Sequence, residues 1–424
     1  MRLYIRHYRY ICALKYLEWP ILAFIMFMAW GFIWNFYDTS VFTSWNKIIE
    51  AKGILSIYEG HTVYPPLFPI IFYLVHKFYI VFFNGIQNVL LLKLILKAPI
   101  IIATLIIAYI LPKFTSTNFK IDIIRFWLWC PSLIALIAIG QYDVISILFI
   151  LLSLYSMKCN RYVISAIFLA IATCIKQFTV LIIPIFMFYA IYNKKWNYII
   201  TYILCSLAIT IPFLIANADN FINKVLFFHI NRRPIGQSII YTLKLIFSIK
   251  DIDFYLSIWN IIFTCSFILT NVVVFKYDVR HINELPESMA VVLFIAIMIN
   301  KVVFPHYLLW FCPFIYIVAL NRGKKYLAHL ANILSLTVLM QMLLWIIAKW
   351  HFSNIQSLSK HVHGVLINII HLIITYMENM LKEHIFVILE FLLIINIMLT
   401  IFIAAQLIKI VIKKTTYKEY SYGS

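Results

Sequence analysis

Two carboxylates interrupt apolar runs of this 424-residue chain at places where a charge needs a reason. Asp38 lies in "NFYDTSVFTSW", directly after the first apolar run, and Asp143 lies in "IALIAIGQYDVIS", between two others. A charged side chain in hydrocarbon costs about 2.5–3.5 kcal/mol on insertion scales, so it normally has a partner or a function. Both acids are candidates for general-base chemistry, in which a carboxylate accepts the proton of an attacking group.

Basic and amide side chains interrupt other apolar runs in the same way. They are Gln141 in "GQYD", Lys176 and Gln177 in "CIKQFTV", His229, Arg232 and Arg233 in "FFHINRRPIGQ", and Lys301 and His306 in "NKVVFPHYLLW". Fixed cations stabilise the charge that develops on a phosphate, and arginine suits bidentate contact with it. Two acids and several cations on one face would suit proton abstraction beside a bound phosphate.

Each of these residues also has a purely structural explanation. Asp38 could be a solvated loop acid, Lys176 could extend its ammonium to the membrane surface, and His306 could be satisfied by backbone groups. Arg232 and Arg233 could be an ordinary loop pair. The combination is therefore more informative than any single member.

The composition indicates a polytopic, all-α membrane protein. Hydrophobic residues make up 64% of the chain, charged residues 12%, and the mean hydropathy is +0.94. A soluble chain would contain about 25% charged residues. Apolar runs of about 17–25 residues recur from end to end, and each is long enough to cross a bilayer as a helix. We predict one integral-membrane domain over residues 1–424 and a multi-pass location.

The net charge of +19 is best explained by basic cytoplasmic loops, not by nucleic-acid binding. With the N-terminus inside, we predict a bundle of about twelve spans, near residues 19–36, 88–111, 123–139, 142–157, 162–177, 178–193, 198–216, 254–275, 288–304, 307–321, 326–347 and 385–412. The short inside loops then carry basic clusters such as Lys194–Lys195 and Arg322–Lys325.

This topology requires that residues 64–87 do not cross the membrane, because a crossing would invert every later loop. We predict membrane-surface helices in this first outer loop, and Pro65, Pro66 and Pro69 fit a broken entry. Asp38, Asp143, Lys176 and the later cations then meet at the outer face.

Four stretches resemble the GT-C superfamily of integral-membrane glycosyltransferases. They resemble most the mannosyltransferases related to the enzyme that adds the second mannose of GPI anchors, and their bacterial and archaeal homologues. The stretches are "YDTSVFTSWNKIIEAKG", "VYPPLFPIIFYL", "CPSLIALIAIGQYDVISILFILLSL" and "AIATCIKQFTVLIIPIFMFY", and "VVFPHYLLWFCPF" resembles a later element. Residues 19–193 thus form a GT-C-like module and residues 194–424 a more variable helical module.

The resemblance implies an inverting hexosyltransferase that uses a polyprenyl- or dolichyl-phosphate sugar on the outer face, with mannose favoured. The acceptor would be a glycan, a glycolipid or a protein. Asp38 is the first candidate for the base and Asp143 the second. Donor contacts would come from Tyr64, Gln141, Lys176, Gln177, Arg232, Arg233, Lys301 and His306. No cofactor is required, and a divalent metal is possible but not indicated.

Two other classes remain open. A lipid or sugar transporter or flippase could carry scattered polar residues on as many spans, although we find no internal repeat. A non-catalytic subunit of a glycosyltransferase complex would tolerate the loss of Asp38. The membrane is the plasma membrane of a prokaryote or the endoplasmic reticulum of a eukaryote.

Overall fold

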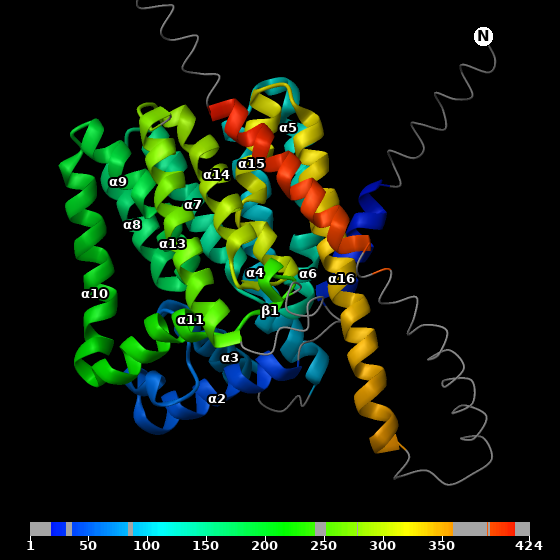
Figure 1. The fold of residues 1–424 in the computed structure, drawn as a ribbon. Coiled ribbons are helices and arrows are strands. Elements are labelled where there is room, and N and C mark those ends of the chain that lie inside the picture. Colours follow the sequence, from blue (N-terminus) through cyan, green and yellow to red (C-terminus); the bar gives the residue numbers. More distant parts are fainter. Residues whose placement is uncertain are drawn as a thin grey trace, which may run out of the picture.

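The computed structural model describes residues 18–30, 36–83, 88–241, 252–277, 279–358, 388 and 391–411. These residues form a helix bundle, with one pair of two-residue strands (Figure 1). A first helix, Glu18–Trp30, is followed by α2 (Phe36–Lys52), η1 (Ile54–Glu59), α3 (Leu67–Phe83), α4 (Val89–Ile110), η2 (Leu111–Phe114), η3 (Thr117–Phe119), α5 (Lys120–Leu128), α6 (Pro131–Ile139), α7 (Asp143–Lys158), α8 (Tyr162–Ile175), η4 (Gln177–Ile182) and α9 (Ile183–Tyr192).

The second half begins with α10, a helix that is broken at Asn217. Its elements are α10 (Trp196–Phe221), η5 (Ile222–Phe227), α11 (Phe228–Asn231), β1 (Ile235–Gly236), α13 (Ile252–Tyr277), η6 (Ile282–Glu284), α14 (Leu285–Ile299), β2 (Val302–Val303), η7 (Pro305–Trp310), α15 (Cys312–Asn321), α16 (Lys325–Leu358) and a last helix, Phe391–Val411.

The all-α, multi-pass architecture predicted from the sequence is confirmed. Six of the described helices are long and apolar enough to cross a membrane, or seven if α5 and α6, which meet at 44°, count as one broken span. A helix lies at each of the twelve predicted spans, but several are short, so the number twelve stays a prediction.

Burial separates a central core from lipid-facing helices. In the apolar window of Ile282–Ile299, 72% of the residues are buried, against 11% in Trp196–Asn231. The helices α7 and α8 pack closely, and the hydroxyls of Ser153 and Ser165 are hydrogen-bonded at 3.0 Å between them. Small polar residues at membrane helix contacts allow this close approach. The peripheral helices α10 and α13 expose large apolar side chains, as lipid contact requires.

The loops predicted to be cytoplasmic meet at one end of the bundle. Lys158 donates to the carbonyl of Lys113 at 3.0 Å, which joins the loop after α7 to the loop after α4. Lys325, after α15, forms an ion pair with Asp122 at 2.6 Å. The 112–122 loop is therefore at the same end as the other two loops, as the predicted topology requires.

The helices α2 and α3 lie across the opposite end, at the bottom of Figure 1. Aromatic rings hold this outer segment against the bundle. Trp45 is fully buried and packs at 5.6 Å from Phe68, which in turn lies 5.0 Å from Tyr142 in the "GQYD" turn. Lys224 adds a polar link, because it donates to the carbonyls of Gly60, at 2.8 Å, and Tyr58. The transverse placement of α3 agrees with the membrane-surface helices predicted for residues 64–87.

A break in α10 turns the chain toward this outer segment. Asn217 has non-helical angles, φ −163° and ψ 76°, and its side chain accepts a hydrogen bond from the amide of Asn220 at 3.2 Å. That contact caps the helical segment that follows. The π-helix η5 comes next, and the chain then runs along the bottom of the bundle to α11 (Figure 1). The break therefore places His229 and Arg232 at the outer end.

The arrangement of the two ends makes a prediction about topology. A cysteine placed at Thr117, in η3, should resist a membrane-impermeant thiol reagent in intact cells, because the 112–122 loop is predicted to be cytoplasmic. A cysteine at the exposed His61, at the opposite end, should react. Labelling is measured in a background in which the native cysteines have been replaced. Rapid labelling at Thr117 from outside would overturn the predicted topology.

Candidate functional site

Each residue of the "GQYD" turn has its own structural role. Gly140 ends α6 in the left-handed conformation, φ 77°, and both its amide and that of Gln141 donate to the carbonyl of Leu136. Glycine adopts this conformation without steric cost, which makes it the usual helix terminator. The Tyr142 hydroxyl donates to the Leu96 carbonyl of α4 at 2.6 Å. The turn is thus anchored on both sides, and Asp143 begins α7 directly after it.

A buried ion pair joins this turn to the break between α8 and η4. The Lys176 ammonium lies 3.0 Å from Asp143 Oδ2, and the two side chains are 6% and 0% exposed. The same ammonium donates to Gln141 Oε1 at 3.2 Å. Lys176 has extended angles where α8 ends, so its side chain leaves the helix and reaches the turn. Removing either charge would leave the other buried and uncompensated.

Aromatic side chains surround the ion pair. The indole of Trp310 donates to Asp143 Oδ1 at 2.9 Å, so both oxygens of the carboxylate are engaged. Trp310 is itself stacked between Phe178, at 4.4 Å, and Tyr307, at 4.3 Å. The Lys176 ammonium lies 4.1 Å from the centre of the Tyr64 ring, a cation–π contact. The ion pair is therefore held in a rigid apolar setting.

A second set of polar groups comes from the chain after α11 and the chain after α14. The strands β1 and β2 join these segments in parallel, and Gly236, φ 77°, allows the approach because a Cβ there would lie 2.1 Å from the Val303 carbonyl oxygen. The Lys301 ammonium donates to Asn260 Oδ1 at 3.0 Å and to the Ile230 carbonyl. The Arg232 guanidinium lies 5.9 Å from the centre of the Phe304 ring.

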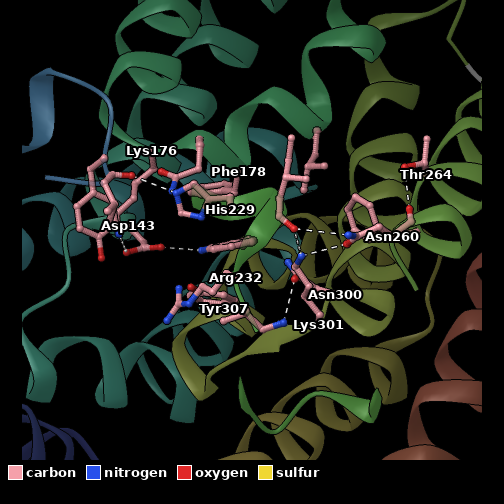
Figure 2. Close-up of a pocket in the computed structure, with 18 of the residues that line it drawn as sticks. Asp143, Lys176, Phe178, His229, Arg232, Asn260, Thr264, Asn300, Lys301 and Tyr307 are labelled. Atoms are coloured by element: carbon pink, nitrogen blue, oxygen red, sulfur yellow. Dashed lines mark hydrogen bonds and ion pairs between the residues drawn. The ribbon is translucent and has the colours of Figure 1, made fainter. Parts of the chain in front are cut away.

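These two sets face a common cavity of about 410 Å³ (Figure 2). Among the described residues that line it are three cations, Lys176, Arg232 and Lys301, and one carboxylate, Asp143. Apart from any contribution of His229, the cavity therefore carries an excess of positive charge, which favours an anionic ligand. Its remaining lining is apolar, aromatic or neutral: Val63, Tyr64, Gln177, Phe178, Leu181, His229, Ile230, Trp259, Asn260, Phe263, Thr264, Asn300, Val302, Tyr307 and Trp310.

Most of the residues predicted from the sequence come together here. The predicted residues that line the cavity are Tyr64, Asp143, Lys176, Gln177, His229, Arg232 and Lys301. Gln141 takes part through its hydrogen bond to Lys176. His306 lies behind the lining, next to Asp143, and its ring is buried. Arg233 is exposed and does not line the cavity, although Arg232 beside it does.

The structure describes His306 and Asp38, the remaining predicted residues, in different degrees. His306 lies between two predicted spans, and burial lowers its pKa to about 4, which disfavours the cation we expected. Asp38 lies in the first turn of α2, at the outer end, and the structure describes its backbone but not its side chain. Its predicted role as base stays a prediction.

The sequence analysis missed one face of α13. Trp259, Asn260, Phe263 and Thr264 all line the cavity, and their spacing places them on the same side of the helix. An Asn and a Thr four residues apart in an otherwise apolar run were the available signal. The described residues contain no group of three His, Cys, Asp or Glu side chains placed to hold a metal ion, and whether the reaction needs one stays untested.

The buried ion pair predicts that a second substitution restores part of the stability that the first one removes. Lys176→Met should lower the melting temperature of the purified protein strongly, because an uncompensated buried carboxylate costs about 3–5 kcal/mol. Adding Asp143→Asn to Lys176→Met should recover part of that loss, since the amide carries no charge. Thermal unfolding in lipid nanodiscs measures both. A double variant less stable than Lys176→Met would contradict the pairing.

No curated protein matches the chain, whereas solved structures do. One of them is ArnT from Cupriavidus metallidurans, bound to undecaprenyl phosphate. It is 10% identical, with a TM-score of 0.44, and the alignment covers 93% of this chain and 77% of ArnT.

A protein-family match is more informative. The sequence model of glycosyltransferase family 87 matches residues 62–305, which is more than half of the chain. The matched region contains the "GQYD" turn, Lys176, Arg232 and Lys301, and so includes the ion pair and the cations of the cavity. The resemblance to integral-membrane glycosyltransferases stated from the sequence is confirmed, and the protein is an enzyme of that class. The chain belongs to glycosyltransferase family 87.

Proposed function

We propose that the protein transfers one sugar from a polyprenyl- or dolichyl-phosphate donor to an acceptor hydroxyl at the outer face of the membrane. Mannose is the sugar that the sequence resemblance favours. The observation that carries the proposal is the cavity with three cations and one carboxylate at the outer end of a membrane bundle. A donor of this type has a charged phosphate and an apolar tail. A cavity that is both cationic and apolar, between lipid-facing helices, suits both parts.

The cations are placed to hold the donor phosphate. Lys176 and Lys301 are fixed by oxygen acceptors on the protein, so their ammonium groups need little reorganisation when a ligand binds. Preorganised charges of this kind stabilise the charge that develops on a leaving group. Arg232 adds a planar guanidinium that can form two parallel hydrogen bonds with phosphate oxygens. The leaving group in this reaction is the lipid phosphate monoester.

Neutral side chains of the cavity suit recognition of the sugar. Asn260, Asn300 and Thr264 offer amide and hydroxyl groups, and Trp259 and Tyr307 offer aromatic surface. Small-molecule sites commonly combine a few polar groups with such apolar walls. The single carboxylate is already paired with Lys176. The cavity is therefore better suited to an uncharged hexose than to a cationic amino sugar.

The engaged state of Asp143 favours Asp38 as the base. One Asp143 oxygen accepts a hydrogen bond from the Trp310 indole, and the other lies 3.0 Å from the Lys176 ammonium, so the carboxylate already has partners on both sides. Asp38 belongs to the first turn of α2, and this helix lies at the same end of the bundle. In the proposed step the acceptor oxygen bonds to C1 of the sugar, the bond from C1 to the phosphate oxygen breaks, and the hydroxyl proton passes to the carboxylate. The anomeric centre is inverted.

The direct test is an assay of the purified protein in nanodiscs against polyprenyl-phosphate mannose, glucose, galactose and arabinose. Release of polyprenyl phosphate and formation of a glycosylated acceptor are measured together, with candidate glycan, glycolipid and peptide acceptors. Transfer from one of these donors is expected, and from mannose first. Transfer only from a nucleotide sugar would contradict the proposal. Donor binding without transfer for every acceptor would favour the non-catalytic subunit.

Arg232 and Arg233 form a matched pair for the phosphate site. Arg232→Ala should raise the donor KM about 10- to 150-fold, since hydrogen bonds to charged groups contribute about 1.5–3 kcal/mol. Arg233→Ala removes the same charge from an exposed position and should change the donor KM less than about 3-fold, a surface effect. Steady-state kinetics of the two variants measure this. Equal effects of the two substitutions would place the phosphate elsewhere.

The base is tested by removing only its basicity. Asp38→Asn keeps the size of the side chain, so binding should survive while kcat falls about 10²–10⁴-fold, the usual contribution of general-base catalysis. Glu50→Gln, an exposed acid of the same helix, is the control and should keep normal turnover. Near-normal turnover of Asp38→Asn would make Asp143 the leading candidate. If Asp143→Asn were also active, neither acid would be the base.

A further inference from the structure

A lysine of α4 is buried behind the site and has no part in the mechanism described so far. The Lys97 side chain is 1% exposed and ranks among the largest fully buried side chains of the described residues. Its ammonium donates to the carbonyl of Ala138 at 2.8 Å and to the carbonyl of Ala29 at 3.0 Å. A charge buried in a membrane protein is costly unless its partners compensate it.

One of the carbonyls that bind Lys97 lies at the observed end of a helix. Ala138 is in the last turn of α6, whose final carbonyls have no partner within the helix. Ala29 is in the last described turn of the first helix. Helix C-termini carry partial negative charge and favour a nearby cation. At the end of α6 the ammonium therefore supplies a donor to a terminal carbonyl, and it joins both segments to α4.

Both segments lead directly to the acids of the site. The end of α6 continues through Gly140 and Gln141 to Asp143, and the first helix precedes α2, which carries Asp38. A Cβ on Gly140 would lie 3.6 Å from Lys97 Cε, so the lysine packs against the turn itself. Beside it, the Leu96 carbonyl accepts the Tyr142 hydroxyl. Consecutive residues of α4 thus hold the turn at two points.

We propose that Lys97 is a positioning residue, whose bonds to the end of α6 and to the first helix set the place of the Asp143–Lys176 pair. The inference rests on the proposed function, in which Lys176 of that pair is one of the cations that bind the donor phosphate. Lys97 acts through the turn: its bond to Ala138 fixes where α6 ends, and so where Gln141 and Asp143 meet the Lys176 ammonium. A displacement of about 1 Å at such a site can lower the rate about 10²-fold.

The ammonium group suits this task better than a neutral donor. It has three N–H donors on a flexible stem, so one side chain can serve carbonyls from separate helices. Methionine at this position would keep most of the length and apolar packing but none of the donors. Arginine would keep the charge and the donors in a different geometry. These two replacements separate the bonds of Lys97 from its bulk.

The experiment compares Lys97→Met in two backgrounds, the wild type and the double variant Asp143→Asn/Lys176→Met. The readout is the affinity of purified protein in nanodiscs for farnesyl phosphate, a short polyprenyl phosphate. If Lys97 acts by placing Lys176, Lys97→Met should weaken binding about 10-fold in the wild type and less than about 3-fold where Lys176 is absent. Lys97→Arg should recover most of the affinity, and Lys93→Met, one turn earlier on α4, should leave it unchanged.

A merely structural lysine would give a different pattern. An equal loss of affinity in both backgrounds, or no loss in the wild type, overturns the inference. If Lys97→Met does not fold, Tyr142→Phe keeps the ring, removes the second link between α4 and the turn, and should show the same dependence on background. If the wild type neither binds farnesyl phosphate nor transfers a sugar, the proposed function fails instead. Thermal unfolding then tests the role of Lys97. If the losses of stability from Lys97→Met and Lys176→Met add in the double variant, the inference is overturned; if the combined loss differs from their sum, it is supported.

Discussion

The ion pair between Asp143 and Lys176 is the constraint on which the rest of the site depends. A carboxylate without solvent contact needs a cation and further donors, and the structure supplies Lys176 on one oxygen and the Trp310 indole on the other. Both side chains are in turn held in place by neighbouring structure. Lys176 reaches the turn only because α8 ends before it, and Trp310 is held between the rings of Phe178 and Tyr307. The outer ends of the core helices are thus arranged around one charge.

That arrangement also determines the sign of the cavity. Because the single carboxylate offsets only one of the three lining cations, the cavity keeps a net positive charge for a ligand. Their segments are joined to each other through two backbone hydrogen bonds between β1 and β2, where only glycine fits at position 236. A membrane glycosyltransferase needs a place where a charged phosphate can lie beside lipid. Here the cations of the cavity lie at the outer end, and the helices that lead from it into the membrane are apolar.

The sequence was sufficient for the helical architecture and for part of the site, for physical reasons that differ by residue. Charges inside apolar runs are conspicuous, so Asp143, Lys176, Arg232 and Lys301 could be found and placed on one face by counting charged loops. The distinction between Arg232 and Arg233 depends on which way the chain turns after α11, and no local pattern contains that information. Trp310 and the α13 face were missed because aromatic and amide residues are common in apolar helices. We expected His306 to be a cation because its burial, which lowers its pKa, depends on tertiary packing that no local sequence pattern shows.

The site belongs as much to the outer segment as to the bundle. The Lys176 ammonium has three N–H donors, and Asp143 and Gln141 occupy two directions while the Tyr64 ring faces it at 4.1 Å. Under the proposed function, a phosphate that approaches this ammonium must share it with, or displace, the ring. Tyr64 precedes α3, and Phe68 within α3 packs on Tyr142 of the turn. The predicted membrane-surface segment therefore forms part of the cavity wall through Tyr64, and under the proposed function its position and the binding of the donor depend on each other.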